Sequence, residues 1–119
     1  EKMNLNEVAF KPIRVLSKGF RQRVGIGKTL LGDPSVLILD EPSVGLDPQQ
    51  VVELRNIIKG LKKDHIIILS THILSEVEEV CDEVVILNKG KICAKGELSQ
   101  LVTQHNKKNL EEVFMEVTK

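Results

Sequence analysis

The sequence predicts an α/β fold with a mostly parallel sheet that is covered by helices. Three short apolar runs, residues 36–39, 66–69 and 84–87, are continuous rather than alternating, which is typical of strands with both faces buried. Segments with the spacing of amphipathic helices lie between these runs. The chain has 119 residues, enough for one domain or part of one, and 41% of them are hydrophobic, which provides for a core.

The first predicted helix begins after Ser17, whose hydroxyl can cap it, and ends at Gly32 before Pro34. The fifteen residues before it are less regular, and Pro12 predicts an extended entry to the helix. The apolar face of this helix is expected to include Phe20, Val24 and Leu31.

The second predicted helix has Asp47 as its N-cap and Pro48 at its first position. Its apolar positions follow helical spacing and are Val51, Leu54, Ile58 and Leu61. A third helix is expected over residues 74–81, where Ser75 and Glu78 have the spacing of a capping box.

Residues 88–90, Asn-Lys-Gly, predict a tight turn from the third strand into a hairpin partner at residues 91–94. Two helices are expected to follow, one over residues 97–104 and one after Asn109. The apolar face of the last helix is Leu110, Val113, Phe114 and Val117. The alternation of strands and helices implies right-handed crossovers.

The charge balance excludes some partners. Seventeen basic and seventeen acidic residues cancel, so no electrostatic footprint for nucleic acid or an anionic membrane is expected. The apolar runs are too short to span a bilayer. Cys81 and Cys93 are isolated and lack metal-binding spacing, which indicates two reduced, partly buried thiols.

The strand at residues 36–39 leads directly into Asp40 and Glu41. Both carboxylates are therefore expected at the carboxyl edge of the sheet, where open α/β sheets bind ligands. Successive strand residues point to opposite faces, so one acid could hold a metal and the other a nucleophile, as phosphoryl transfer requires. A strand that ends in an acidic turn is an equally open interpretation of these two residues.

Ser17, Lys18 and Gly19 lie at a predicted helix N-terminus, where unpaired N–H groups and the helix dipole favour phosphate. An ordinary helix cap is the alternative. His72 follows the second strand at the same sheet edge, where a structural histidine is also common, and a capping role explains Asp47 without further function.

In their order and spacing these four features resemble the ABC ATPase family. They match its signature motif, its Walker B strand with the catalytic glutamate, its D-loop and its switch histidine. The resemblance covers essentially the whole chain, and residues 13–48, 84–96 and 109–118 look most like ATP-binding subunits of ABC-2-type exporters, including the gliding-motility branch. It implies a partial P-loop NTPase fold, with ATP and Mg²⁺ as cofactors.

The resemblance also implies roles at the signature motif. Ser17, Lys18 and Gly19 would contact the γ-phosphate of ATP held by a partner domain. Lys18 and Phe20 stand where the common motif Leu-Ser-Gly-Gly-Gln has a Gly and the Gln. Lys18 is familiar in the ABC-2 branch and adds positive charge near phosphate, whereas Phe20 leaves any polar role of the Gln unfilled.

For the remaining residues, the resemblance implies that Asp40 holds Mg²⁺ and that Glu41 polarises the attacking water. His72 would contact the γ-phosphate, and Asp47 would reach across a dimer interface.

Residues 25–29, Gly-Ile-Gly-Lys-Thr, resemble the end of a P-loop, but Gln22 stands where the first Gly is required and no strand precedes the segment. In the ABC ATPase family a P-loop and a glutamine loop precede the signature motif. The resemblance to that family therefore implies that both lie upstream of Glu1. The subdivision expected for the chain is the end of a helical subdomain at 1–32, the Walker B to switch-histidine sheet region at 33–96 and C-terminal helices at 97–119.

Without the P-loop strand, the strand at residues 66–69 is expected either to pair directly with residues 84–87 or to associate with another chain through its free edge.

The implied function is an ATPase subunit of an exporter, held at the cytoplasmic face of the membrane by a transmembrane permease and paired with a second ABC ATPase domain. No nucleic-acid partner is expected, and these residues alone are expected to be inactive. Two alternatives stay open: a non-transport ABC ATPase that acts on nucleic acid or ribosomes, and an inert folded module.

Overall fold

The computed structural model describes residues 2–119 and divides into two compact units, which meet in sequence between Thr71 and His72. The predicted α/β class is confirmed: the first unit contains a small parallel sheet with helices, and the second contains a hairpin with helices. The finer subdivision at residues 32 and 96 stays a prediction.

The first unit opens with two short 3₁₀ turns, η1 (Asn6–Val8) and η2 (Ile13–Val15), before helix α1 (Lys18–Leu30). The predicted cap is confirmed, because the Oγ of Ser17 accepts a hydrogen bond from the N–H of Phe20 at 3.3 Å. The predicted apolar face is wrong at Leu31, which is 87% exposed. Leu31 follows the last helical residue, and the buried face runs through Gly19, Arg23 and Ile26 instead.

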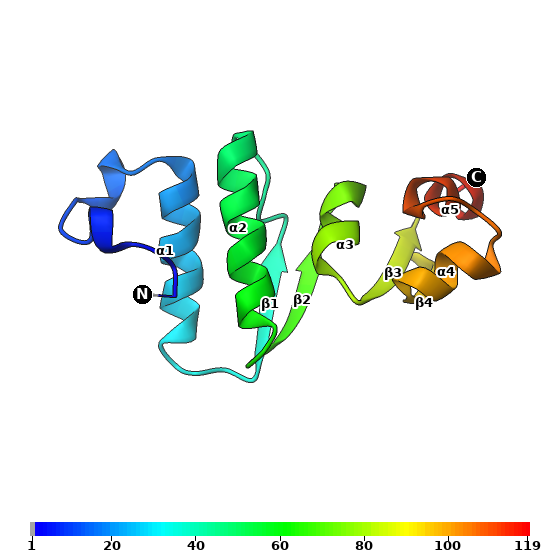
Figure 1. Ribbon diagram of the computed structural model, residues 1–119, viewed down its shortest axis with the longest axis horizontal. Coiled ribbons are helices and arrows are strands. Elements are labelled where there is room, and N and C mark those ends of the chain that lie inside the picture. The colour runs from blue at the N-terminus through cyan, green and yellow to red at the C-terminus, as the bar shows by residue number, and fades with distance from the viewer. Residues whose placement is uncertain (1) are drawn as a thin grey trace. The chain divides into compact units, whose positions relative to one another are not determined.

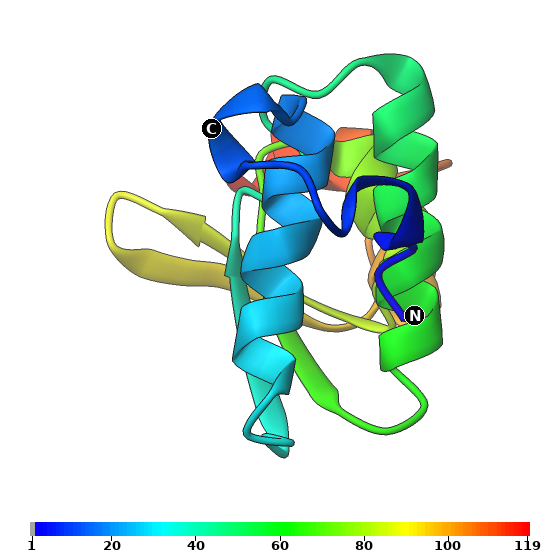
Figure 2. The same ribbon diagram turned by 90° about the vertical axis from the view of Figure 1, so that its left-hand side faces the viewer.

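A β–α–β unit follows, made of β1 (Val36–Asp40), α2 (Pro48–Leu61) and β2 (Ile66–Ser70) (Figure 1). The strands pair in parallel, with Val36 opposite Ile66 and Asp40 opposite Ser70. α2 begins with a capping box between Asp47 and Gln50, which extends the predicted cap. α1 lies beside α2 (Figure 2).

The parallel sheet is covered on one face within this unit. Leu37 and Leu39 are buried, whereas the alternate positions are exposed: Val36 45%, Ile38 74%, Ile66 66% and Ile68 55%. The expectation that both faces are buried is therefore wrong for the described residues. A continuous apolar run indicates that a strand can be buried on both faces of its sheet. In this unit α2 covers only one face of the sheet.

The expected direct pairing of the second and third strands is also wrong. Among residues 2–119, the strands form two separate two-stranded sheets, β1 with β2 and β3 (Glu83–Asn88) with β4 (Lys91–Glu97). β3 pairs with β4, its neighbour in sequence, as the predicted hairpin requires, and this pairing closes only a short loop. The turn residues Lys89 and Gly90 have φ values of 51° and 76°, as a tight hairpin turn requires. Association through the free edge of β2 stays a prediction.

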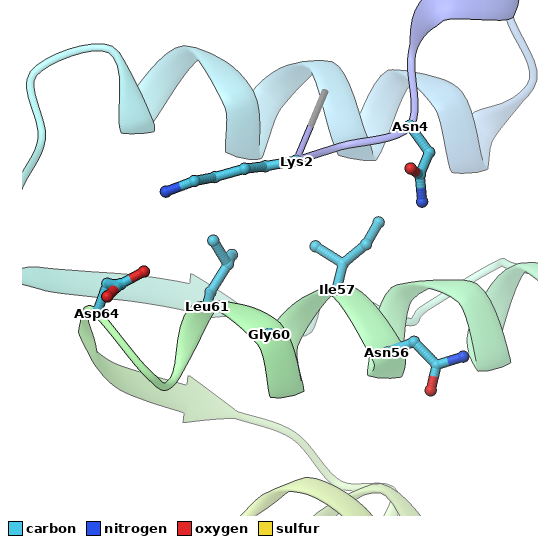
Figure 3. A pocket seen from close by; sticks show the side chains of 7 residues that line it. All are labelled: Lys2, Asn4, Asn56, Ile57, Gly60, Leu61 and Asp64. Atoms are coloured by element: carbon cyan, nitrogen blue, oxygen red, sulfur yellow. The ribbon is translucent and has the colours of Figure 1, made fainter.

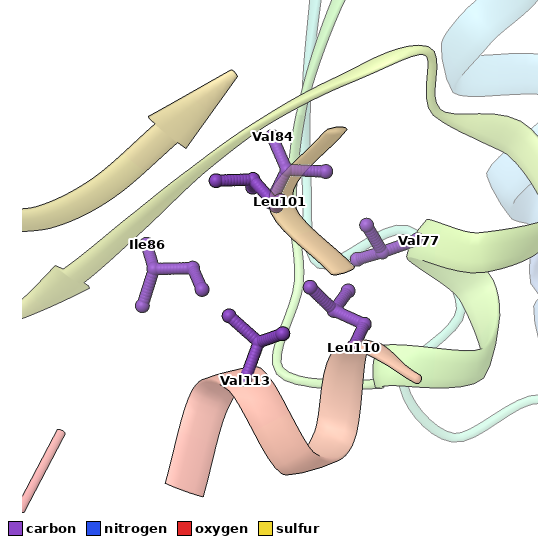
Figure 4. Close-up of a cluster of buried hydrophobic side chains, with 6 residues drawn as sticks. All are labelled: Val77, Val84, Ile86, Leu101, Leu110 and Val113. Atoms are coloured by element: carbon purple, nitrogen blue, oxygen red, sulfur yellow. The ribbon is translucent and has the colours of Figure 1, made fainter. Parts of the chain in front are cut away.

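The second unit also contains α3 (Leu74–Val80), α4 (Leu98–Gln104) and α5 (Leu110–Val117). Its core is a cluster of buried aliphatic side chains from three helices and β3 (Figure 4): Val77, Val84, Ile86, Leu101, Leu110 and Val113. The predicted cap of the last helix is confirmed, because Asn109 Oδ1 accepts from the N–H of Glu112 at 3.0 Å.

The predicted capping box of α3 is wrong. The N-cap is Ile73, which makes no side-chain cap, and Ser75 lies one residue inside the helix. Cys81 and Cys93 are half-buried, and neither forms a disulfide in the structure. None of the helices within residues 2–119 has the length and hydrophobicity that a bilayer span requires.

Candidate functional site

The carboxyl edge of the parallel sheet brings together Asp40, Glu41 and Ser70. Asp40 and Ser70 are opposite in the strand register, and the Oγ of Ser70 donates a hydrogen bond to the carboxylate of Asp40. The N–H of Glu41 donates to the carbonyl oxygen of Ser70 at 2.9 Å and contacts its Oγ at 3.2 Å. The predicted edge position of both acids is therefore confirmed, and Ser70 is a neighbour that sequence reasoning missed.

Glu41 has a φ of +47°, in the left-handed region that a non-glycine residue rarely adopts. β1 therefore ends at Asp40, and the side chains of Asp40 and Glu41 do not simply alternate across a strand. Such a conformation costs about 1–3 kcal/mol and persists where surrounding contacts fix it. Those contacts are the two bonds to Ser70 and the burial of Pro42 and Ser43.

The N-termini of α1 and α2 meet through Gln50. Its Nε2 donates to Ser17 Oγ at 3.3 Å, and its Oε1 accepts from the N–H of Asp47 at 3.2 Å. Asp47 Oδ1 in turn accepts from the N–H of Gln50 at 2.9 Å. The structure thus connects two predicted site residues, Ser17 and Asp47, through one that sequence reasoning did not select. The signal was present, since Asp-x-x-Gln is capping-box spacing.

At two glycines, the side chain of another segment comes close to the backbone. A Cβ added at Gly19 would lie 2.8 Å from Gln50 Cδ, so a larger residue would require the Gln50 side chain to shift. Gly45 has a φ of +78°, and the ammonium of Lys18 lies against the position that a Cβ there would occupy. The structure therefore places Lys18 over the predicted D-loop, and its contact with phosphate stays a prediction.

Phe20 supports the junction of the two helices. Its ring centroid is 4.8 Å from the guanidinium carbon of Arg23, a cation–π contact. The guanidinium of Arg23, whose side chain is only 8% exposed, also forms an ion pair with Glu53 of α2. Phe20 thus has a packing role at the position where the common motif has Gln.

His72 is exposed and belongs to the second unit, so its predicted contact with the same phosphate as Ser17 stays a prediction. The glycine-rich segment at residues 25–29 lies inside α1, where Thr29 Oγ1 donates to the carbonyl of Ile26 at 2.6 Å. It is therefore helix rather than a phosphate-binding loop.

A cleft of about 310 Å³ lies between the N-terminal segment and α2 (Figure 3). It is lined by Lys2, Asn4, Asn56, Ile57, Gly60, Leu61 and Asp64, and by none of the predicted site residues.

The described residues contain no group of three His, Cys, Asp or Glu side chains that could hold a metal ion by itself. Asp40 and Ser70 nevertheless present oxygen atoms at the sheet edge. Mg²⁺ is often held by one or two carboxylates together with water and substrate phosphates, so this donor set fits a magnesium ion that is shared with a nucleotide.

Comparison with known protein families shows that residues 1–44 match the family described as "ABC transporter". The chain is 44% identical over 104 residues to the uncharacterized ABC transporter ATP-binding protein YxlF of Bacillus subtilis. The aligned region covers 87% of this chain and 35% of that protein. It is 40% identical over 114 residues to the lantibiotic transport ATP-binding protein SrtF of Streptococcus pyogenes, covering 95% of this chain and 47% of that protein.

The fold is shared with solved structures. An ATP-binding subunit of an ABC transporter superposes with a TM-score of 0.76 at 39% identity, over 90% of this chain and 46% of the other. The protein cbiO1 from Clostridium perfringens, part of the transporter complex cbiONQ, gives a TM-score of 0.79 at 32% identity, over 87% and 42%. The chain thus spans less than half the length of these relatives.

Proposed function

We propose that this chain, which belongs to the ABC transporter ATP-binding family and matches part of its ATP-binding domain, comes from a subunit that hydrolyses ATP to drive export across a membrane. The observation that carries the proposal is the sheet edge, where Asp40, Glu41 and Ser70 meet in one hydrogen-bonded group. An acid with metal-binding oxygens beside an acid fixed in a turn suits phosphoryl transfer to water.

In this mechanism Asp40, held by the hydroxyl of Ser70, would contribute its carboxylate to a magnesium ion. When bound, the ion neutralises charge on the phosphate oxygens. Glu41 accepts a proton from, and orients, the attacking water, and its backbone bonds to Ser70 keep it at the sheet edge. The resemblance to the family assigns His72 a contact with the γ-phosphate, which we retain as part of the proposal.

The signature residues act on ATP held by a second ABC domain. Ser17, Lys18 and Gly19 lie at the N-terminus of α1, where N–H groups and the helix dipole favour phosphate. Asp47, which joins this N-terminus through Gln50, reaches across the same interface. The 119 residues contain no complete P-loop motif, so we propose that these residues alone do not hydrolyse ATP.

The names of two relatives support a role in transport, and one of these names specifies export. One acts in lantibiotic transport, and another, 36% identical over 114 residues, is the Nod factor export ATP-binding protein I of Ralstonia nicotianae. The membership of cbiO1 in a transporter complex supports a permease partner at the cytoplasmic face of the membrane. A role on nucleic acid or ribosomes is less well supported, because the 17 basic and 17 acidic residues balance.

The test is ATP hydrolysis by the natural full-length protein with its permease. The wild type should hydrolyse ATP only with Mg²⁺, and Asp40→Asn should lower the rate about 10²-fold, which corresponds to about 2.7 kcal/mol on the barrier. Hydrolysis that is equal in both proteins, or independent of Mg²⁺, would contradict the assignment.

A further inference from the structure

The hydroxyl of Ser17 has only one hydrogen-bonding position left among its contacts in the structure. A serine hydroxyl can accept two hydrogen bonds and donate one. Ser17 Oγ accepts from the N–H of Phe20 at 3.3 Å and from Nε2 of Gln50 at 3.3 Å. Both acceptor positions are filled by groups that cannot accept, so the O–H proton remains to be donated elsewhere.

The orientation of the Gln50 amide follows from its other partner. The backbone N–H of Asp47 can only donate, and it lies 3.2 Å from Oε1 of Gln50. That contact requires the oxygen of the amide, so the NH₂ group must face Ser17. Asp47, the N-cap of α2, therefore fixes the orientation of the Gln50 amide. That orientation makes the Ser17 hydroxyl accept a hydrogen bond from Gln50 rather than donate one to it.

We propose that Gln50 is a positioning residue that keeps the Ser17 hydroxyl in the donor orientation which a phosphate oxygen requires. This inference rests on the proposed function, in which Ser17 contacts the ATP of a partner domain. A hydroxyl that is free to rotate loses part of its donor capacity to competing acceptors. A hydroxyl with both acceptor positions filled can bind a group only by donating to it, which selects an acceptor such as phosphate.

The packing of Gly19 supports this role. A Cβ at Gly19 would lie 2.8 Å from Cδ and 2.9 Å from Nε2 of Gln50, so the glycine leaves room for the side chain that contacts Ser17. A larger residue at position 19 would therefore displace the Gln50 side chain from its contact with Ser17.

Two substitutions separate positioning from structure. Gln50→Glu keeps the capping box, since Glu is a standard residue at this position, but its carboxylate can only accept and reverses the polarity of Ser17. Gln50→Met keeps the size and removes both hydrogen bonds. Gln49→Glu adds the same charge one residue earlier on the exposed side of α2, where the Gln49 side chain contacts Glu53 at 3.3 Å but not Ser17, and serves as the matched control.

The measurement is dimerisation of the natural full-length protein induced by a non-hydrolysable ATP analogue, together with thermal unfolding. Relative to Gln49→Glu, we expect Gln50→Glu to weaken dimerisation about tenfold or more at an unchanged melting temperature, because a donor to phosphate is lost. Gln50→Met should weaken it about threefold and lower the melting temperature, because the cap is lost. The two readouts therefore rank the variants differently.

A Ser17→Ala background completes the test, since Gln50 acts through Ser17. There, Gln50→Glu should cost no more than Gln49→Glu. An equal loss in both backgrounds, or no difference between the two Glu variants with Ser17 present, would overturn the inference while leaving the proposed function intact. Normal dimerisation of Ser17→Ala would instead overturn the proposed role of Ser17, and the inference with it.

Discussion

The backbone N–H of Glu41 donates to the carbonyl oxygen of Ser70 at 2.9 Å, across the carboxyl ends of two parallel strands. The hydroxyl of the same serine donates to Asp40. One residue on β2 thus contacts both acids at the end of β1, and the geometry of this sheet edge depends on the strand register.

Ser70→Ala tests this dependence. It removes the hydroxyl bond to Asp40 and the contact with the N–H of Glu41, and we expect hydrolysis by the full-length protein to fall about tenfold, or 1.4 kcal/mol on the barrier. Stability should fall by only about 1 kcal/mol. Ser35→Ala, at the other end of β1, is the control. Equal activity of the two variants would remove Ser70 from the site.

Gly45→Ala should destabilise the protein, because Gly45 has a φ of +78° and the ammonium of Lys18 lies where the new Cβ would be. We expect a loss of about 1–2 kcal/mol from the left-handed backbone alone. Gly25→Ala is the matched control, because nothing lies within 4 Å of its Cβ inside α1. That change should stabilise by about 0.5–1 kcal/mol. The comparison uses denaturant unfolding, and an equal effect of both changes would be inconsistent with this account.

Ser17→Arg should block the ATP-induced dimer. A bulky cation at the N-terminus of α1 would displace the phosphate contacts that we propose for Ser17. Binding of ATP by the separate full-length protein should be retained. Sedimentation with a bound ATP analogue measures the dimer, and an affinity equal to that of the wild type would count against the signature-motif assignment.

The 119 residues on their own should bind ATP weakly and hydrolyse none, because they contain no complete P-loop motif. Titration calorimetry with Mg–ATP measures the binding. Tight, Mg²⁺-dependent binding would require a phosphate-binding site within these 119 residues. Residues 25–29 would then have to be reconsidered as that site, despite their helical structure in α1.

Local signals predicted much of the fold. The caps Ser17, Asp47 and Asn109 were found because each acts within four residues of itself. The same reasoning was wrong at Ser75, where capping-box spacing occurs inside the first turn of α3. Spacing alone does not say where a helix begins.

Contacts between distant residues were not predicted. Ser70 reaches Asp40 and Gln50 reaches Ser17 across 30 and 33 residues of sequence. Both depend on strand register and helix packing, which composition and periodicity do not specify. The left-handed Glu41 was missed for a related reason, because its backbone angle is fixed by Ser70 on the neighbouring strand rather than by its own neighbours in sequence.

The role proposed for Glu41 is to activate the water that attacks ATP. Steady-state hydrolysis at saturating Mg–ATP by the full-length Glu41→Gln protein tests it most directly, with Glu7→Gln, an exposed acid near the N-terminus, as the control. A general base contributes about 10²–10⁴-fold, so we expect turnover to fall by that factor while ATP binding is unchanged. Turnover near that of Glu7→Gln would contradict the claim.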